Sequence, residues 1–350
     1  MDRERAAAFS ETLLRRYSDA MTVLFIDLGD RTGLLDAATK GGTVEDIATR
    51  AGLAERPVRE WLHGMVTSGV VEHDPDTGSF RLPVEHASLL TGETPYNLAP
   101  LARAASAGFA NASRIAKAFR DGGGIPSDEL HDGLFEIADR MSRYRFDALM
   151  TDVYLPTSGP VYDRLREHGG RVADIGCGTG HAVNVMARAM PAAEVVGYDL
   201  HQPALDRGRA EAQQLGLDNV RFERADVTAI AADGDYDLIT AFDVIHDLPD
   251  PKVALTAIRQ HVSDDGVFLL YDVGAPSDLA AQVDLPWAPL MYGFSTSYCI
   301  QNSLAGGGEA LGNMWGRERT EALLRDVGFP RIEVTNPPLD PINLLYVCHP

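Results

Sequence analysis

The hydrophobic pattern changes its period about halfway along the chain. In the first part, residues 11–40 carry apolar side chains at helical spacing, and a pattern of short helices continues to about residue 67. The stretch GVVEHDPDTGSFRL then predicts two short strands joined by the turn DPDTG, in which Gly78 supplies a positive-φ position. Helix, turn, helix and paired strands together predict an α-rich winged-helix domain over residues 1–95.

Capping signals fix the limits of two of these helices. Thr43 can cap a helix with Asp46 in its third position, and Gly52 can close it. We expect the next helix to run from about Glu55 to Thr67.

Residues 96–165 predict linker or cap helices. The segment DGGGIPSDE breaks the helical pattern, because three glycines and a proline disfavour a continuous helix. The following stretch, FEIADRMSRYRFDALM, is amphipathic, and we expect Phe135, Ala138, Met141 and Phe146 to share one face. These helices would bridge the two domains, and could also line an active site or a dimer interface.

Beyond Arg171 short β-rich runs alternate with helical segments. The runs are RVADI, AEVVGYD, NVRFERAD, YDLITAFD and GVFLLYD, and the pair RIEVTN and INLLYVCH closes the chain. Such alternation predicts an α/β fold with helices on both faces of a Rossmann-like, seven-stranded, mostly parallel sheet over residues 166–350. Ligands of such sheets bind at the carboxyl ends of the strands.

Composition narrows the class of protein. The chain has 350 residues, is 45% hydrophobic and has a formal charge of −20. Its apolar runs are short and its start lacks the apolar core of a secretory signal, so we expect a cytoplasmic enzyme without a membrane partner. Cys177, Cys299 and Cys348 are scattered, which argues against disulfides or a structural zinc site and predicts small buried side chains.

The charge also bears on the winged helix, since such domains often bind DNA. Residues 1–95 hold 16 acidic against 10 basic side chains, a net charge of −6. In the second helix Arg56 and Arg59 are balanced by Glu55 and Glu60, which leaves no excess charge for phosphate. We therefore expect a homodimerisation module and no nucleic-acid partner; the alternative is a DNA-binding regulator with a cofactor-sensing domain.

The stretch VADIGCGTG, residues 172–180, predicts a ligand-binding turn between a strand and a helix. Its glycines lie at 176, 178 and 180, whereas a dinucleotide fingerprint requires the last glycine at position 181, which is His181. Pyrophosphate binding is therefore disfavoured. The N–H groups at the helix start can instead meet a carboxylate.

Three acidic residues at strand ends describe the rest of the ligand. Asp174 could accept from an ammonium group, and Asp199 stands where a carboxylate would take both hydroxyls of a ribose. Asp226 is placed to accept from an adenine amino group, with Val227 against the ring. An amino acid, a ribose and an adenine together make S-adenosyl-L-methionine.

At this point the chain resembles the class I S-adenosylmethionine-dependent methyltransferases. The resembling motifs are VADIGCGTG, VVGYDL, ERADV and ITAFDVIHDLPDP, in the expected order. A stretch SYCIQNSLAGGGEALGNMWG is also similar to an actinobacterial-type group of methyltransferases with a winged-helix start. The resemblance implies that the cofactor-binding residues are Asp174, Gly176, Cys177, Gly178, Gly180, Asp199, Leu200, Asp226, Val227, Phe242 and Asp243.

His246, in FDVIHDLPD, is the best candidate for a general base, since it follows the fourth strand at the ligand edge. The stretch resembles the VLHDW-type segment of small-molecule O-methyltransferases, in which the histidine is the base, but Leu248 stands where that group has tryptophan. Two alternatives stay open: the histidine only shapes the site, or the acceptor is nitrogen or carbon and needs no base.

No metal is predicted for the reaction. Asp243 and Asp272 lie at strand ends, but no Asp-Asn pair follows the fifth strand. Residues 274–316 form a long insertion whose aromatic and methionine side chains suit an apolar pocket for a small-molecule acceptor. The alternative is that Trp287, Tyr292, Phe294 and Trp315 belong to cores and interfaces. AGGGEALG is typical of a flexible lid or turn.

Overall fold

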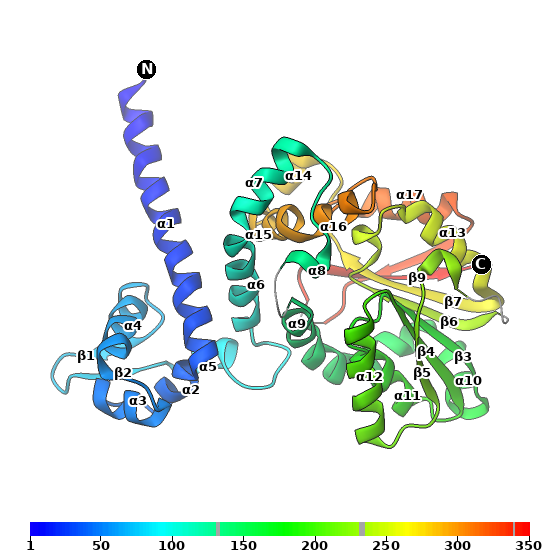
Figure 1. The fold of residues 1–350 in the computed structure, drawn as a ribbon, viewed down its shortest axis with the longest axis horizontal. Coiled ribbons are helices and arrows are strands. Elements are labelled where there is room, and N and C mark those ends of the chain that lie inside the picture. Colours follow the sequence, from blue (N-terminus) through cyan, green and yellow to red (C-terminus); the bar gives the residue numbers. More distant parts are fainter. Residues whose placement is uncertain (131–133, 231–234, 339) are drawn as a thin grey trace. The chain divides into compact units, whose positions relative to one another are not determined.

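The computed structural model divides into two compact units, Met1–Phe109 and Ala110–Pro350 (Figure 1). It describes residues 1–130, 134–230, 235–338 and 340–350. The predicted boundaries at residues 95 and 165 remain a prediction.

The first unit has the predicted winged-helix architecture. Its elements are α1 (Arg3–Thr32), α2 (Leu34–Thr39), α3 (Val44–Ala51), α4 (Glu55–Thr67), β1 (Glu72–Asp74), β2 (Ser79–Arg81), α5 (Val84–Leu90) and α6 (Ala99–Ala110), the last of which ends at the unit boundary. β1 and β2 pair antiparallel, with Glu72 opposite Arg81. Gly78 has a φ of 67° in the turn between them, as predicted.

The predicted caps of α3 are confirmed. Thr43 and Asp46 form a reciprocal capping box, and Gly52 closes the helix in the left-handed conformation. The helices then bury one core, centred on Ile47, Leu62 and Met65, which are fully buried. Local capping and this shared core explain why the short helices hold together.

Helices α7 (Ala112–Asp121), α8 (Ser127–Leu130), α9 (Leu134–Leu149) and α10 (Pro160–His168) precede the sheet. A π-turn (Met150–Tyr154) and a 3₁₀ turn (Leu155–Ser158) join α9 to α10. The predicted shared face of α9 is wrong in part. Ala138 and Met141 are exposed, Phe146 is buried, and the side chain of Phe135 lies outside the described part of the chain. Ile137 and Leu149 are buried on α9 as well as Phe146, because packing within the second unit sets the inward face.

The second unit is built on a seven-stranded sheet of order β5-β4-β3-β6-β7-β9-β8. The strands are β3 (Gly170–Ile175), β4 (Ala193–Asp199), β5 (Val220–Arg224), β6 (Tyr236–Phe242), β7 (Val262–Val273), β8 (Arg331–Thr335) and β9 (Asn343–His349). Strands β3 to β7 are parallel, and β9 runs antiparallel to both β7 and β8. The predicted mostly parallel sheet and its closing strand pair are confirmed.

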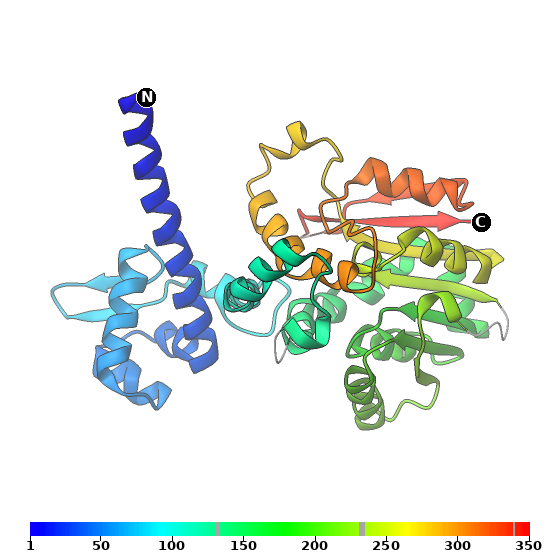
Figure 2. The same ribbon diagram turned by 45° about the horizontal axis from the view of Figure 1, so that its top comes forward.

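Alternate residues of the strands enter two separate cores, one on each face of the sheet. Helices cover both faces (Figure 2). Val172 and Leu238 point toward α10, α11 (His181–Ala189) and α12 (Gln202–Leu215). Ala173 and Ile239 point toward α13 (Pro251–His261) and α17 (Arg317–Asp326). The winding reverses between β3 and β6, and the crevice at their carboxyl ends is where such sheets bind ligands.

Residues 274–316 hold α14 (Leu279–Gln282), α15 (Ala288–Phe294), a π-turn η5 (Ser295–Cys299) and α16 (Ile300–Ala305). Trp315 is buried in the sheet core, and Trp287 and Phe294 pack against a small core of the insertion, so these three aromatic side chains serve packing. The AGGG turn packs on Pro249. A Cβ on Gly308 would lie 2.3 Å from Pro249 Cα, which explains the glycine.

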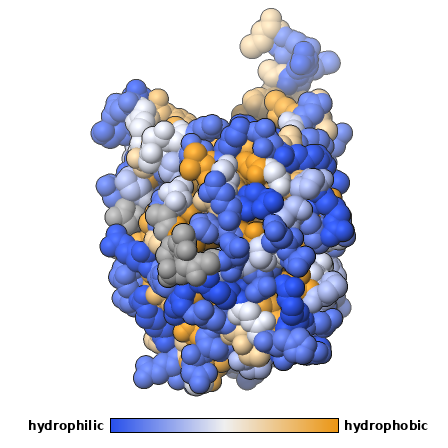
Figure 3. Space-filling view, turned by 90° about the vertical axis from the view of Figure 1, so that its right-hand side faces the viewer, coloured by the Kyte–Doolittle hydropathy of each residue, from blue (hydrophilic) through white to orange (hydrophobic). Residues whose placement is uncertain are grey.

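On the face seen in Figure 3 hydrophilic residues predominate, with hydrophobic side chains in small groups. Within residues 1–130, 134–230, 235–338 and 340–350, no helix combines the length and apolar character that crossing a bilayer requires.

Candidate functional site

The glycine loop joins β3 to α11 with all three of its glycines at positive φ. Gly176, Gly178 and Gly180 have φ values of 67°, 54° and 76°. A Cβ would lie 2.3 Å from Val244 at Gly176 and 2.3 Å from Phe222 at Gly180, so both are glycines for close packing. At Gly178 no atom lies within 4 Å of such a Cβ. This open position leaves backbone accessible to a ligand.

Asp199 ends β4 directly beside this loop. One carboxylate oxygen accepts the N–H of Gly178 at 2.8 Å, and the other accepts the N–H of His201 at 2.8 Å. Each oxygen keeps a further lone pair, so both can still accept from a pair of hydroxyls. Leu200, the next residue, is exposed.

Asp226 and Val227 follow β5, as predicted. Asp226 is exposed, and its Oδ1 accepts the N–H of Thr228 at 2.8 Å, which caps a short 3₁₀ turn. Val227 is buried in the core below it. The cap orients the whole carboxylate, so its second oxygen is held at an exposed position.

Asp174, in β3, is a buried carboxylate. It is 2% exposed and accepts the Thr240 hydroxyl at 2.6 Å. Burial raises the pKa of Asp174 to about 7, and the Thr240 hydrogen bond only partly offsets that effect. A cationic ligand group beside Asp174 would relieve the cost of its charge. Thr240 was not predicted, because its inward position follows only from the pairing of β3 with β6.

Replacing Asp174 with Asn should stabilise the ligand-free protein, and more so at high pH. The folded-state pKa of about 7 lies above the unfolded value near 3.8, so charging Asp174 costs stability progressively as the pH rises between them. The asparagine side chain carries no charge but can still accept from Thr240. We expect a gain on the order of 2 kcal/mol at pH 8 and a smaller one at pH 5, measured as melting temperature by scanning calorimetry.

The matched control is Asp152→Asn, which alters an exposed carboxylate of the same unit. A gain for Asp174→Asn that is equal at the two pH values, or no larger than the control's, would show that Asp174 is not held at a charge cost.

Helix α9 is anchored to the glycine loop by a network that the sequence did not predict. The hydroxyl of Thr179 donates to Asp139 at 2.6 Å, and Arg143 binds both Asp139 and Glu211, at 2.8 and 2.6 Å. His181, at the start of α11, lies 2.9 Å from Glu211. The residue that rules out a dinucleotide fingerprint thus fixes the loop to its neighbours.

A second contact from α9 reaches the end of β6. Asp243 has a φ of 52°, a strained conformation for a residue other than glycine, and its carboxylate accepts from Arg145 at 3.2 Å. The Arg145 guanidinium lies over the Tyr271 ring, 4.5 Å from its centroid. Phe242 packs edge-on against Phe146 at 5.0 Å. Residues of α9 therefore line the site beside the predicted Phe242 and Asp243.

His246 lies in a buried 3₁₀ turn (Ile245–Asp247) after β6 and is 4% exposed. Its Nδ1 is 2.7 Å from the fully buried Asp272, at the end of β7, and its Nε2 is 3.3 Å from Asp247. Burial alone would lower the pKa of His246, but the two carboxylates outweigh it and hold the pKa well above the usual imidazole value. Such an imidazolium must lose its proton before it can act as a base.

The insertion, residues 274–316, lies against the 3₁₀ turn that holds His246. Cys299 is buried, as predicted, and it also lies beside His246 and Asp247, which was not predicted. Cys348 is buried too, whereas Cys177 is half-buried in the glycine loop. Burial raises the pKa of Tyr298 well above its usual range, and the Asp247 and Asp199 carboxylates add to this effect. The Tyr298 side chain packs against the small core formed by Ile115, Ile125 and Leu130.

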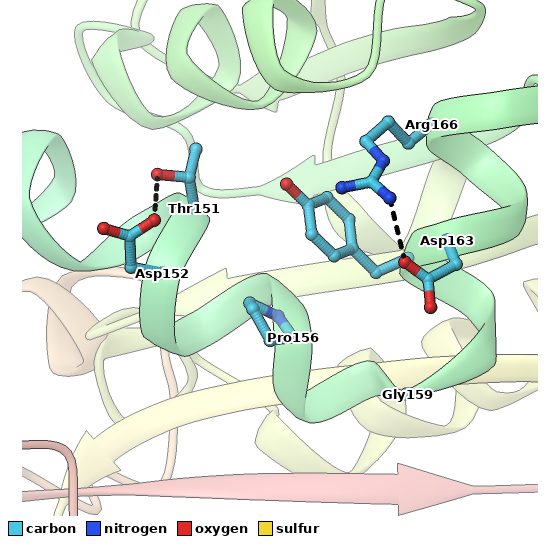
Figure 4. Close-up of a pocket in the computed structure, with 7 residues that line it drawn as sticks. Thr151, Asp152, Pro156, Gly159, Asp163 and Arg166 are labelled. Atoms are coloured by element: carbon cyan, nitrogen blue, oxygen red, sulfur yellow. Dashed lines mark hydrogen bonds and ion pairs between the residues drawn. The ribbon is translucent and has the colours of Figure 1, made fainter.

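A separate pocket of about 620 Å³ lies between the turns that follow α9 and helix α10 (Figure 4). Thr151 donates to Asp152 at 3.3 Å on one wall, and Arg166 pairs with Asp163 at 3.3 Å on the other. None of the predicted site residues, all of which the structure describes, lines this pocket. It is not the site described above.

Two family models match this chain, one in the winged-helix unit and one in the unit built on the seven-stranded sheet. Residues 166–303 match a family model described as a methyltransferase domain, and residues 20–92 match an Rv2258c-like winged HTH domain. A ubiquinone biosynthesis O-methyltransferase from Acinetobacter baumannii is 33% identical over 100 residues, which are 28% of this chain and 41% of that protein. The match thus spans about two fifths of that relative's length.

Solved structures are similar over both units. An O-methyltransferase family protein from Burkholderia thailandensis has a TM-score of 0.71 at 17% identity, covering 97% of this chain and 98% of that one. Human N-acetylserotonin methyltransferase, solved in complex with SAM, has a TM-score of 0.66 at 16% identity, covering 97% of both chains. The fold is therefore shared along nearly the whole chain, in which the winged helix-turn-helix match precedes the methyltransferase-domain match.

Proposed function

We propose that the chain is an S-adenosylmethionine-dependent methyltransferase that methylates a hydroxyl oxygen of a small molecule. The observation that carries the proposal is the pair formed by His246 and the buried Asp272, at the same sheet edge as the glycine loop. A glycine loop alone would suit many ligands. A histidine with a carboxylate partner beside it adds a group able to take a proton.

The residues present suit S-adenosylmethionine. Gly178 leaves an open approach to the loop backbone, and Asp199 keeps two free acceptor positions beside it. On this proposal Gly176, Cys177, Gly178, Gly180 and Asp174 hold the methionine part, Asp199 and Leu200 the ribose, and Asp226 and Val227 the adenine. Phe242 and Asp243 lie beside the reacting end. When bound, the cofactor supplies a methyl group on a sulfonium, an already activated leaving group.

The chain's own task is then to place the acceptor and remove its proton. A neutral hydroxyl is a poor nucleophile, so a base at the acceptor raises the rate. Asp272 fixes the Nδ1 side of His246, so Nε2, once it has lost its own proton to solvent, is the atom that takes the proton of the acceptor. Oxygen is preferred over nitrogen because a neutral amine can attack before it loses its proton, whereas a neutral hydroxyl needs a base. Two of the relatives named above are also described as O-methyltransferases.

Incubation with S-adenosylmethionine and a panel of hydroxylated aromatic compounds tests this activity. We expect S-adenosylhomocysteine to accumulate together with a methyl ether of at least one compound. Accumulation no faster than in the absence of protein, across panels of hydroxyl, amine and carbon acceptors, would contradict the proposal.

The winged helix is proposed to serve dimerisation, and DNA binding is disfavoured. On α4, Arg56 pairs with Glu60 at 2.5 Å and Arg59 with Glu55 at 3.8 Å. Each arginine thus already has an anionic neighbour, which lowers what it could gain from a phosphate. The cytoplasmic location expected from the sequence stays a prediction.

Helix α1 supports a homodimer. Five apolar side chains on it are exposed by 39–65% and recur at alternating spacings of three and four residues: Leu14, Tyr17, Met21, Leu24 and Leu28. This is the heptad spacing of a coiled-coil seam. A second copy of the chain would cover the stripe.

Replacing Met21 with Glu, at the centre of this stripe, should raise the dimer dissociation constant at least about 100-fold, since two apolar contacts are lost and two charges are buried. Arg15→Glu places the same residue on α1 outside the stripe and should leave dimerisation nearly unchanged. Light scattering after gel filtration measures both. A monomeric wild type, or equal effects of the two variants, would overturn the α1 interface.

A further inference from the structure

Three side chains of the kinds that bind transition metals meet beside the glycine-loop edge of the sheet. His246 and Asp247 come from the turn after β6, and Cys299 comes from the end of η5 in the insertion. One ligand atom from each lies within 4.8 Å of the other two. His246 and Cys299 are each 4% exposed, and the Asp247 side chain is 13% exposed.

The spacing suits a tetrahedral ion. Zinc bonds to nitrogen and oxygen of about 2.0–2.2 Å at a tetrahedral angle place those two ligand atoms about 3.4 Å apart. His246 Nε2 and Asp247 Oδ1 are 3.3 Å apart. The separation between the Cys299 sulfur and the other two ligand atoms, at most 4.8 Å, must shorten by up to about 1.3 Å to reach tetrahedral bonding distances.

Two further observations point to a ligand at this position. Asp247 Oδ1 is buried and accepts no hydrogen bond among the described residues, because its ion-pair contact with His246 Nε2, at 3.3 Å, lacks hydrogen-bond geometry. His246 Nδ1 is held by the carboxylate of Asp272 at 2.7 Å. A carboxylate on the far nitrogen of a histidine is the usual support of a zinc-binding imidazole.

The insertion fixes Cys299 over the turn. The hydroxyl of Ser303 donates to the carbonyl of Leu248 at 3.0 Å, and the N–H of Glu309 donates to the carbonyl of Pro249 at 3.0 Å. Cys299 ends a π-turn, an irregularity that recurs at functional sites. The cysteine is therefore held beside the histidine by contacts on its C-terminal side.

We propose that His246, Asp247 and Cys299 form a binding site for Zn²⁺, with a fourth coordination position left to water. As zinc binds, the Cys299 thiol and the Nε2 of the His246 imidazolium each lose a proton to solvent, and the Zn–S and Zn–N bonds form. Imidazole, thiolate and carboxylate together favour zinc over magnesium or calcium, which take oxygen ligands.

Zinc at this site would inhibit methyl transfer, because it occupies the same Nε2 that takes the proton of the acceptor. This consequence rests on the proposed function, whereas zinc binding itself does not. No zinc ion is needed for the reaction as proposed, so the zinc site would be inhibitory.

Titration of the full-length protein with Zn²⁺ alone, without cofactor or acceptor, tests the site. We expect one ion per chain by calorimetry, and an affinity at least about 100-fold lower in Cys299→Ala. Asp272→Asn, which alters only the supporting carboxylate, should lower the affinity for zinc about 10–100-fold. Cys348→Ala, which removes a buried thiol of β9 that is not among these ligands, should bind like the wild type.

Co²⁺ gives a second readout that reports the thiolate directly. A sulfur-to-cobalt charge-transfer absorption should appear in the wild type and in Cys348→Ala, but not in Cys299→Ala, and it should persist with weaker affinity in Asp247→Asn. Absence of zinc binding in the wild type, or binding unchanged in both Cys299→Ala and Asp247→Asn, would overturn the site.

The inhibitory role is tested separately, with an acceptor that the methyl-transfer assay has identified. We expect Zn²⁺ to lower wild-type turnover and a chelator to restore it, and we expect the ratio of rates with and without zinc to approach one in Cys299→Ala. Zinc that binds at the site without lowering turnover would overturn the inhibition. If no methyl transfer is found at all, the calorimetric and cobalt results still decide the metal site.

Discussion

Replacing His246 with Ala should lower the turnover number at least about 10²-fold and leave the affinity for S-adenosylhomocysteine within about twofold. The reason lies in its surroundings. His246 is the imidazole that a buried carboxylate, Asp272, orients at the carboxyl edge of the sheet, and its described polar contacts are with residues outside the predicted cofactor-binding set. Initial rates with the acceptor identified above, and calorimetry with S-adenosylhomocysteine, measure the two quantities.

The matched control is His168→Ala, which removes an exposed histidine at the end of α10 and should leave turnover unchanged. Added imidazole should restore part of the rate of His246→Ala, since a free base can enter the vacated space, whereas a histidine that only shapes the site would give no such rescue. Turnover of His246→Ala equal to that of wild type would remove the base and favour an acceptor that needs none.

The parts of the fold that the sequence predicted correctly depend on local signals. The Thr43 capping box, the left-handed Gly52 and the turn at Gly78 each need only a few neighbouring residues. The glycine loop is of the same kind, because positive φ at three positions within five residues leaves few alternatives to a tight strand-to-helix turn.

The contacts that sequence reasoning missed join distant parts of the chain. Arg145 and Asp243 are 98 positions apart, and Thr179 and Asp139 are 40 apart. Helix periodicity showed that α9 is amphipathic but not which face turns inward, since packing decides that. The loop is therefore anchored by a helix whose residues carry no recognisable motif.

For His246, its position in the chain could be predicted from the sequence, but its contacts could not. Its place after β6 could be read from the sequence, and so could Asp272 at the end of β7. Their hydrogen bond could not, because it depends on β6 and β7 being neighbours in the sheet. The approach of Cys299 to His246 could not be predicted either, because it depends on the path of the whole insertion.

Replacing Asp199 with Ala should weaken the binding of S-adenosylhomocysteine at least about 100-fold. Each hydrogen bond from a ligand hydroxyl to a carboxylate is worth about 1.5–3 kcal/mol, and the two oxygens of Asp199 each have a free acceptor position. The variant also frees the N–H groups of Gly178 and His201. Asp199→Asn can still accept from one of these N–H groups, so its affinity for S-adenosylhomocysteine should fall less than that of Asp199→Ala.

Asp218→Ala removes an exposed carboxylate just before β5 and should bind S-adenosylhomocysteine like the wild type. It separates the effect of Asp199 from a general change in the charge of this acidic chain.

The most direct test of the account is calorimetric titration of the wild-type protein with S-adenosylhomocysteine. Binding of one molecule per chain, retained in Asp218→Ala and weakened at least about 100-fold in Asp199→Ala, is the predicted result. A wild type that binds no S-adenosylhomocysteine, or an Asp199→Ala variant that binds it equally well, would contradict the assignment of the glycine loop and Asp199 as the cofactor site.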